Sequence, residues 1–133
     1  KYDRMSIFNS LFGNSEETQK IESSINWIPM TNLGQLNEIM TVSETKPVII
    51  FKHSTRCSVS RMALKQFENE FDLAEEVDTY FLDLLEYRDV SNEIASRFQV
   101  EHQSPQLILI KDGKAIYDVS HSAIDAVELK GKL

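Results

Sequence analysis

Short, continuous apolar runs alternate along this chain with segments in which apolar residues recur every three or four positions. Such runs are typical of strands buried on both faces, as in parallel sheets, and the wider spacing is typical of amphipathic helices. The runs that predict strands cover residues 27–30, 47–51, 77–85, 106–110 and 115–119. The spaced segments predict helices over residues 33–40, for about four turns after residue 57, and over residues 90–98.

Polar residues that favour helix starts support these boundaries. Thr31 and Asn32 precede the first predicted helix, and Asp89 is a candidate N-cap of the third. Ser122, followed three residues later by Asp125, resembles a capping box and predicts a short final helix.

Asp112-Gly113 lies between the last two apolar runs and is the strongest hairpin signal in the chain. The predicted order is therefore strand, helix, strand, helix, strand, helix, strand, strand, helix. The early alternation requires crossover connections, and the hairpin makes the last pair of strands antiparallel. We expect an α/β fold with a central mixed sheet flanked by helices.

The chain divides into three parts. Residues 1–4 precede Met5 and are interpreted as an expression remnant, with an internal methionine in a trimmed protein as the alternative. Residues 5–24 are interpreted as an amphipathic arm followed by a polar linker, and residues 25–133 as one domain. The apolar residues of the arm fall at helical spacing: Ile7, Phe8, Leu11 and Phe12.

Composition excludes several classes of function. A formal charge of -7 and a pI near 4.9 argue against nucleic acid or a membrane surface as a partner, because phosphate binding needs a basic face. No apolar stretch approaches the roughly 20 residues that span a bilayer. With one cysteine, an internal disulfide cannot form, so we expect a reducing, cytosolic setting and intermolecular disulfide chemistry.

That cysteine, Cys57, lies between an apolar run and a predicted helix. The N–H groups and dipole of a helix N-terminus stabilise a thiolate, which is the form that attacks disulfides. Ser60, one helical turn later, cannot close a disulfide, so a group transferred to Cys57 stays there until a second thiol removes it. The alternative is a buried, inert cysteine. Four basic residues flank the site: Lys52, Arg56, Arg61 and Lys65.

Two sequence blocks carry a resemblance to a known family. They are Phe51-Lys52-His53-Ser54-Thr55-Arg56-Cys57-Ser58-Val59-Ser60 and Gln103-Ser104-Pro105-Gln106. Over about residues 25–128 the chain resembles the YtxJ family, the monothiol bacilliredoxins of the thioredoxin superfamily, although family members often carry proline where Ser58 stands. The resemblance implies a thioredoxin-like fold and a monothiol thiol-disulfide oxidoreductase. Its reaction would remove a low-molecular-weight thiol, bacillithiol in the better-known hosts, from protein mixed disulfides. The small thiol would be a co-substrate, with no bound cofactor.

The resemblance also implies a cis bond between Ser104 and Pro105 beside the cysteine, with the Ser104 backbone pairing to an extended substrate. Without it, a proline opening a strand would be unremarkable. The catalytic residues would be Cys57 as nucleophile and Ser60 as hydrogen-bond donor to the sulfur, unless Ser60 is only a helix-surface residue.

Each remaining candidate has two interpretations. His53 either acts at the site, by pairing with the thiolate or contacting the client, or is only a packed or solvated residue. Arg56 binds carboxylates of the small thiol bidentately, or is an ordinary exposed cation. His102 and His121 carry no signal, and no cysteine and histidine spacing indicates a metal site.

Two rival functions remain open. We expect a monomer or weak dimer. One rival is a thioredoxin-like binding module whose cysteine only senses redox state. The other is an iron–sulfur carrier of the monothiol glutaredoxin type, in which Cys57 and an exogenous thiol ligate a cluster across a dimer. The chain lacks the Cys-Gly-Phe-Ser motif of such carriers.

Overall fold

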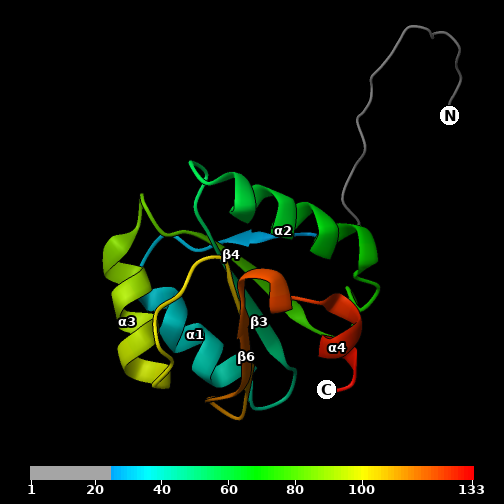
Figure 1. Ribbon diagram of the computed structural model, residues 1–133. Coiled ribbons are helices and arrows are strands. Elements are labelled where there is room, and N and C mark those ends of the chain that lie inside the picture. The colour runs from blue at the N-terminus through cyan, green and yellow to red at the C-terminus, as the bar shows by residue number, and fades with distance from the viewer. Residues whose placement is uncertain (1–24) are drawn as a thin grey trace, which may run out of the picture.

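A computed structural model describes residues 25–133, so residues 1–4 and the arm and linker of residues 5–24 lie outside the described residues. One five-stranded sheet has helices on both faces (Figure 1). The elements are β2 (Ile28–Pro29), α1 (Gly34–Val42), β3 (Val48–His53), α2 (Ser58–Glu70), β4 (Asp78–Asp83), α3 (Arg88–Phe98), β5 (Gln106–Lys111), β6 (Lys114–Ser120), the 3-10 helix η2 (His121–Ala123) and α4 (Ala126–Lys130). Their order confirms the predicted alternation, with η2 added.

The strands lie in the order β2-β4-β3-β5-β6. The first three are mutually parallel, whereas β5 runs antiparallel to β3 and to β6. The mixed sheet is the one expected of a thioredoxin-like fold. Because β3 and β5 are antiparallel, with Lys52 opposite Gln106, the C-terminal end of β3 and the N-terminal end of β5 lie at the same end of the sheet. Both sequence blocks singled out above lie at this end.

The predicted hairpin turn forms at Asp112 and Gly113. Both residues have positive φ, 52° and 74°, which suits a two-residue turn of the type that matches strand twist. The turn also binds the end of α1, because the Gly113 N–H donates to Ser43 Oγ at 2.8 Å and the Asp112 N–H to the Ser43 carbonyl at 2.7 Å.

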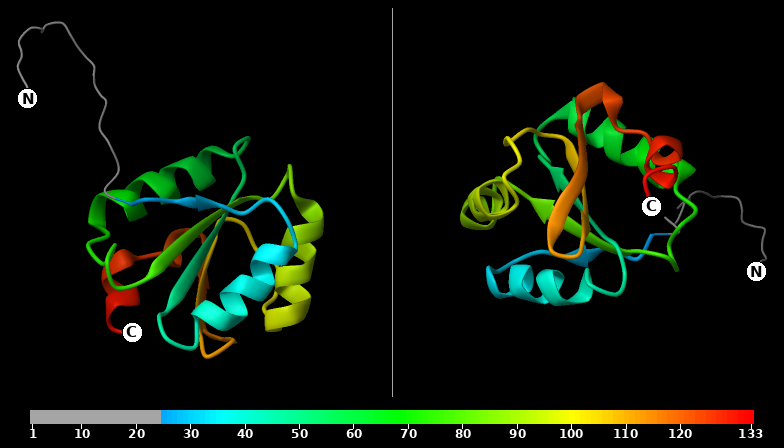
Figure 2. Two further views of the ribbon diagram at one scale, coloured as in Figure 1. Left: turned by 180° about the vertical axis from the view of Figure 1, so that it is seen from behind. Right: turned by 90° about the horizontal axis from the view of Figure 1, so that it is seen from below.

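The core has two halves, one on each face of the sheet. Helices α1 and α3 cover one face, and α2 and α4 cover the other (Figure 2). Successive residues of β3 alternate between them, since Ile50 packs toward α1 and α3 and Phe51 toward α2. Phe67 of α2 lies 5.6 Å from the Phe51 ring and 5.1 Å from the Phe71 ring, measured between centroids. These rings fix α2, and with it Cys57, over the sheet.

The N-cap of helix α1 is Leu33, not the predicted Thr31 or Asn32, and Leu33 makes no side-chain cap hydrogen bond. The two predicted residues still contribute to the helix start. Asn32 Oδ1 accepts from the Gln35 N–H at 3.2 Å, and Gln35 Oε1 accepts in return from the N–H groups of Asn32 at 3.2 Å and Thr31 at 2.6 Å. This reciprocal pairing satisfies backbone donors that the first helical turn leaves free.

The Asp89 N-cap prediction is wrong. Helix α3 begins two residues earlier than predicted, at Arg88, so that Tyr87 is the N-cap and Asp89 lies inside the first turn. There its carboxylate accepts from the Val90 N–H at 2.8 Å. An acidic side chain in the first turn still stabilises the helix dipole, which explains why the sequence pattern pointed to this region.

The capping box predicted for the last helix is also wrong in detail. Asp125, its second member, is itself the N-cap of α4 and accepts from the N–H groups of Val127 at 2.8 Å and Glu128 at 3.3 Å. Ser122 lies in η2 instead. The final helix therefore starts three residues later than the box implied.

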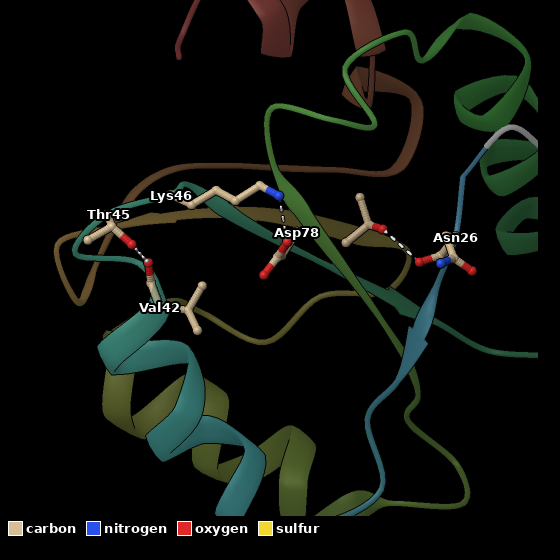
Figure 3. A network of polar contacts seen from close by, with 6 residues as sticks. Asn26, Val42, Thr45, Lys46 and Asp78 are labelled. Carbon is tan, nitrogen blue, oxygen red and sulfur yellow. Dashed lines mark hydrogen bonds and ion pairs between the residues drawn. The ribbon is translucent and has the colours of Figure 1, made fainter.

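Polar contacts join the segments at the opposite end of the sheet, where β3 and β4 begin (Figure 3). Lys46, just before β3, forms an ion pair of 3.1 Å with Asp78 at the start of β4. Next to it, the Thr79 hydroxyl donates to the Asn26 carbonyl at 3.2 Å, which anchors the segment before β2. The polar side chains at this end of the sheet therefore pair with one another and hold the fold. Within residues 25–133, no helix has the length and apolar character needed to cross a membrane.

Candidate active site

Cys57 is the N-cap residue of α2. The chain leaves β3 after His53, makes a short turn in which the Cys57 N–H donates to the Ser54 carbonyl at 3.1 Å, and enters the helix. Cys57 has an extended backbone, with φ −109° and ψ 122°, and its carbonyl accepts the first helical hydrogen bond, from Arg61 N–H at 3.1 Å. The side chain is partly exposed. A strand, a turn and a helix start therefore present the sulfur at the surface.

The surroundings of the sulfur favour its anion. The side chain makes no cap hydrogen bond of full geometry, but the nearby N–H groups of Ser60 and then Val59 are the main causes that lower the pKa of Cys57. Burial, the next largest effect, raises this pKa, and the weaker effects of the Ser60 hydroxyl and the Arg61 charge lower it. These are the effects expected of a thiol at a helix N-terminus. Cys57 is therefore not the buried cysteine of the alternative reading, and its role as a nucleophile stays a prediction.

Ser60 is fully buried behind the cysteine. Its Oγ accepts from the Ser54 N–H at 3.3 Å. Because a hydroxyl has one donor hydrogen besides its acceptor lone pairs, that bond leaves the Ser60 proton free to point at the sulfur of Cys57. The reading of Ser60 as a helix-surface residue does not hold, since no part of it faces solvent.

The positive charge near the sulfur comes from α2. The Arg61 guanidinium donates to the Thr55 carbonyl at 3.1 Å, so it both braces the turn and acts on the thiol. Arg56 is exposed, and no side-chain contact is described for it within residues 25–133. The structure thus leaves Arg56 available at the surface next to Cys57.

Lys52 does not flank the cysteine as the sequence suggested. Its side chain is fully buried on the face covered by α1 and α3, because it alternates with the residues that point toward α2. There Lys52 Nζ lies 3.0 Å from His102 Nδ1, and burial lowers the pKa of Lys52 to about 8.

His102, which sequence analysis set aside, is exposed itself but closes a partly buried polar cluster with Lys52. Besides Lys52, its Nδ1 lies 3.4 Å from the Ser91 hydroxyl of α3. Burial, followed by the Lys52 charge, lowers the pKa of His102. No periodic pattern or motif marks this histidine, because a loop carries it to the sheet.

His53 ends β3 with its side chain buried on the α2 side. Its ring lies 5.3 Å from that of Phe81, and burial lowers the pKa of His53 against the opposing charge of Asp83. The interactions that act on the Cys57 thiol come from α2 itself. A direct role of His53 toward thiolate or client stays a prediction.

The loop before β5 lies at the same end of the sheet as the C-terminal end of β3. The Ser104–Pro105 peptide bond is cis, as expected. Ser104 Oγ is buried without a hydrogen-bond partner among the described residues, and the Pro105 carbonyl accepts from the His121 N–H at 3.0 Å. The proline loop is thereby joined to the segment that follows β6.

Comparisons with known proteins agree with this geometry. A family model described as monothiol bacilliredoxin BrxC matches residues 28–129. A structure titled a putative oxidoreductase with a thioredoxin fold is 30% identical, with a TM-score of 0.67, and the match covers 78% of this chain and 90% of that one. Thioredoxin from Malassezia sympodialis is 18% identical with a TM-score of 0.64, over 87% and 95% of the two chains. The thioredoxin of Fasciola hepatica is 16% identical with a TM-score of 0.60, over 78% and 93%.

The two thioredoxins are similar in fold alone, whereas the family match spans the cysteine turn, α2 and the proline loop. Among residues 25–133, no group of three or more histidine, cysteine or carboxylate side chains could hold a metal ion. A thiol redox role follows from the family and the neighbouring structures. The chain belongs to the monothiol bacilliredoxin family.

Proposed function

We propose that the protein removes a low-molecular-weight thiol, bacillithiol or a similar one, from protein mixed disulfides through Cys57. The observation that carries the proposal is the thiol at the N-cap of α2, where backbone N–H groups and Arg61 lower its pKa. It has a serine three residues later in place of a second cysteine. An activated thiol without a resolving partner suits transfer of a small group.

The reaction has two exchanges that balance. The Cys57 thiolate attacks the sulfur of the small thiol in the client disulfide, so that a Cys57–thiol disulfide forms and the client thiolate leaves and takes up a proton. A second molecule of the small thiol, as its thiolate, then attacks the small-thiol sulfur of the disulfide on Cys57. This step releases the oxidised small thiol and restores the Cys57 thiolate.

The surrounding residues take supporting parts in this scheme. Ser60 stabilises the attacking and leaving thiolate through its buried hydroxyl. Arg56, exposed and without a described partner, binds a carboxylate of the small thiol. The Ser104 backbone, which lies at the same end of the sheet as Cys57, pairs with the extended client chain.

The proposal is tested by turnover on a client protein that carries one small-thiol cap. We expect the wild-type chain to release the uncapped client repeatedly in excess small thiol, and the Cys57→Ser variant to release none above the uncatalysed rate. Circular dichroism of the variant checks that it remains folded. Equal release with both proteins would place the chemistry outside Cys57.

The same samples distinguish the two rivals. A binding or redox-sensing module would take up one cap on Cys57 and then stop, without multiple turnover. A carrier of an iron–sulfur cluster would show visible absorbance after anaerobic cluster assembly with the small thiol, and would lose it in Cys57→Ser.

A further inference from the structure

Lys52 is a charged residue in the interior of the domain without an acidic partner. Its side chain is 0% exposed. None of the ion pairs within residues 25–133 includes it, and the contact of 3.0 Å with His102 Nδ1 is the polar contact described for its ammonium group. A buried charge without a counter-charge costs free energy of folding. Stability therefore does not explain why a lysine occupies this position.

The contact of Lys52 holds the loop between α3 and β5, residues 99–105, which is the proline loop. Within the described part of the chain, residues 101–104 make no backbone–backbone hydrogen bond. Side chains fasten this segment instead, since Lys52 Nζ contacts the His102 ring and Gln106 Nε2 donates to the Glu101 carbonyl at 2.9 Å. Lys52 and Gln106 are partners in the β3–β5 register, so their side chains hold the loop from the same face of the sheet.

The chemistry of the two groups fixes the direction of the hydrogen bond. An ammonium group can only donate, so His102 Nδ1 accepts and the neutral ring carries its hydrogen on Nε2. Burial first, and then the charges of Lys52 and Arg88, lower the pKa of His102, which keeps Nδ1 unprotonated at neutral pH. The Ser91 hydroxyl of α3 lies 3.4 Å from the same nitrogen. Because its donor is charged, the bond from Lys52 is the stronger of the two.

We propose that Lys52 is a positioning residue for client binding, whose hydrogen bond to His102 holds the proline loop in the conformation in which the Ser104 backbone pairs with an extended client. The proposal rests on the proposed function and assigns Lys52 no contact with the client or with the sulfur. His102 precedes Ser104 by two residues, so a shift of the ring moves the N–H and C=O groups that would pair. A residue that lowers stability is expected where function requires it.

The variant Lys52→Met tests the proposal, because it keeps an unbranched apolar side chain and removes the donor. Two substrates are compared: a short peptide with one cysteine capped by bacillithiol, and hydroxyethyl disulfide, which has no peptide backbone to pair. We expect KM for the peptide to rise several-fold with kcat little changed, and both constants for the small disulfide to stay at the wild-type values. Lys111→Met removes the same charge at the far end of β5 and should match wild type.

Two variants of His102 separate the hydrogen bond from the bulk of the ring. In His102→Gln the side-chain carbonyl can still accept from Lys52, so KM for the peptide should stay near the wild-type value. In His102→Leu no acceptor remains, and KM should rise as it does in Lys52→Met. The double variant Lys52→Met/His102→Leu should be no worse than either single variant, because all three lack the same bond.

Amide hydrogen exchange of residues 99–106 reports on the loop without any turnover. We expect exchange there to be several-fold faster in Lys52→Met and His102→Leu than in wild type, with exchange of α2 unchanged. Wild-type exchange in both variants, equal changes on the peptide and the small disulfide, or a His102→Gln variant as impaired as His102→Leu would overturn the proposal. A wild-type chain that does not turn over the capped peptide would instead refute the thiol-transfer function, and hydrogen exchange would still decide whether Lys52 holds the loop.

Discussion

At the scale of single residues, the groups around one sulfur atom lower the pKa of Cys57. Two backbone N–H groups, a buried hydroxyl and an arginine favour the thiolate, and only partial burial opposes it. Because the largest effects come from the backbone of the first turn of α2, they depend on Cys57 being the N-cap. A thiol placed one turn later would lose them.

Ser60→Ala tests the contribution of the buried hydroxyl. A lowered pKa means that the thiolate persists at lower pH, so the alkylation rate of wild type should fall only once pH drops below the range of an ordinary thiol, about 8.5. In Ser60→Ala we expect the inflection to move upward and the rate near pH 6.5 to drop several-fold. Iodoacetamide alkylation followed by mass spectrometry measures both profiles.

Ser58→Ala is the control, because Ser58 is exposed at the start of the same helix. Its profile should overlay that of wild type. A Ser60→Ala profile that also overlays wild type would show that the hydroxyl has no effect on the thiol.

Lys52→Met tests the buried lysine. The pKa of Lys52 is about 8 in the folded protein, against 10.5 for an ordinary lysine. Below pH 8 both states are protonated and the folded state bears the full cost of the buried charge, about 3 kcal/mol at 1.36 kcal/mol per unit. Between pH 8 and 10.5 the unfolded chain binds more protons, so the stability of wild type rises with pH.

We therefore expect Lys52→Met to raise the free energy of unfolding by up to about 3 kcal/mol at pH 7, with an advantage that shrinks toward pH 10.5. Urea denaturation across this range measures it. Lys65→Met, at an exposed site, should stay within about 0.5 kcal/mol of wild type. A variant less stable than wild type at pH 7 would mean that His102 and Ser91 more than compensate the buried charge.

At the scale of elements, the sequence predicts strands and helices well because their patterns are local. The apolar runs mark β3 and β5, and the Asp112-Gly113 pair marks the hairpin, since a turn with two positive φ angles needs such residues. Helix starts are less certain, because an acidic side chain such as Asp89 serves equally well one position inside a helix.

What the sequence could not reveal is the direction in which side chains point. Lys52 is five residues before Cys57 and looked like a neighbour of the sulfur. The pleat of a strand that is buried on both faces sends it to the opposite side, and no apolar alternation shows which face is which. His102 joins Lys52 through loop packing, for which single-sequence patterns give no sign.

Gly113→Ala tests the hairpin. At φ +74° an alanine is strained, and its Cβ would lie 3.2 Å from the Met40 side chain, which can move. We expect a loss of about 1 to 2 kcal/mol in the free energy of unfolding, measured in urea. Gly131→Ala is the matched control: Gly131 has φ −72° and room for a Cβ, so its change should stay below about 0.5 kcal/mol. Equal losses would remove the conformational explanation.

At the scale of the whole molecule, two fields of opposite sign act on an approaching disulfide. The chain carries a formal charge of -7, whereas Arg56 and Arg61 lie beside the cysteine. Because screening shortens the reach of charges from about 30 Å at 0.01 M salt to about 10 Å at 0.1 M, salt dependence reveals which field dominates.

We expect the local field to dominate. The rate of Cys57 with an anionic aromatic disulfide should then fall several-fold between about 0.01 and 0.3 M salt, and the rate with a neutral dipyridyl disulfide should hardly change. Arg61→Gln should weaken the salt dependence of the rate with the anionic disulfide. A rate that rises with salt would show instead that repulsion by the acidic surface controls the approach.

The central claim, that Cys57 takes the small thiol and holds it, is tested most directly by intact mass spectrometry of a single turnover with a capped client. We expect the client to lose one cap while the wild-type chain gains the same mass on Cys57. In Ser60→Cys, a second thiol then closes a disulfide with Cys57, so the gain should vanish and leave a loss of two hydrogens. A client that keeps its cap, or a covalent complex between Cys57 and the client with free small thiol released, would contradict the claim.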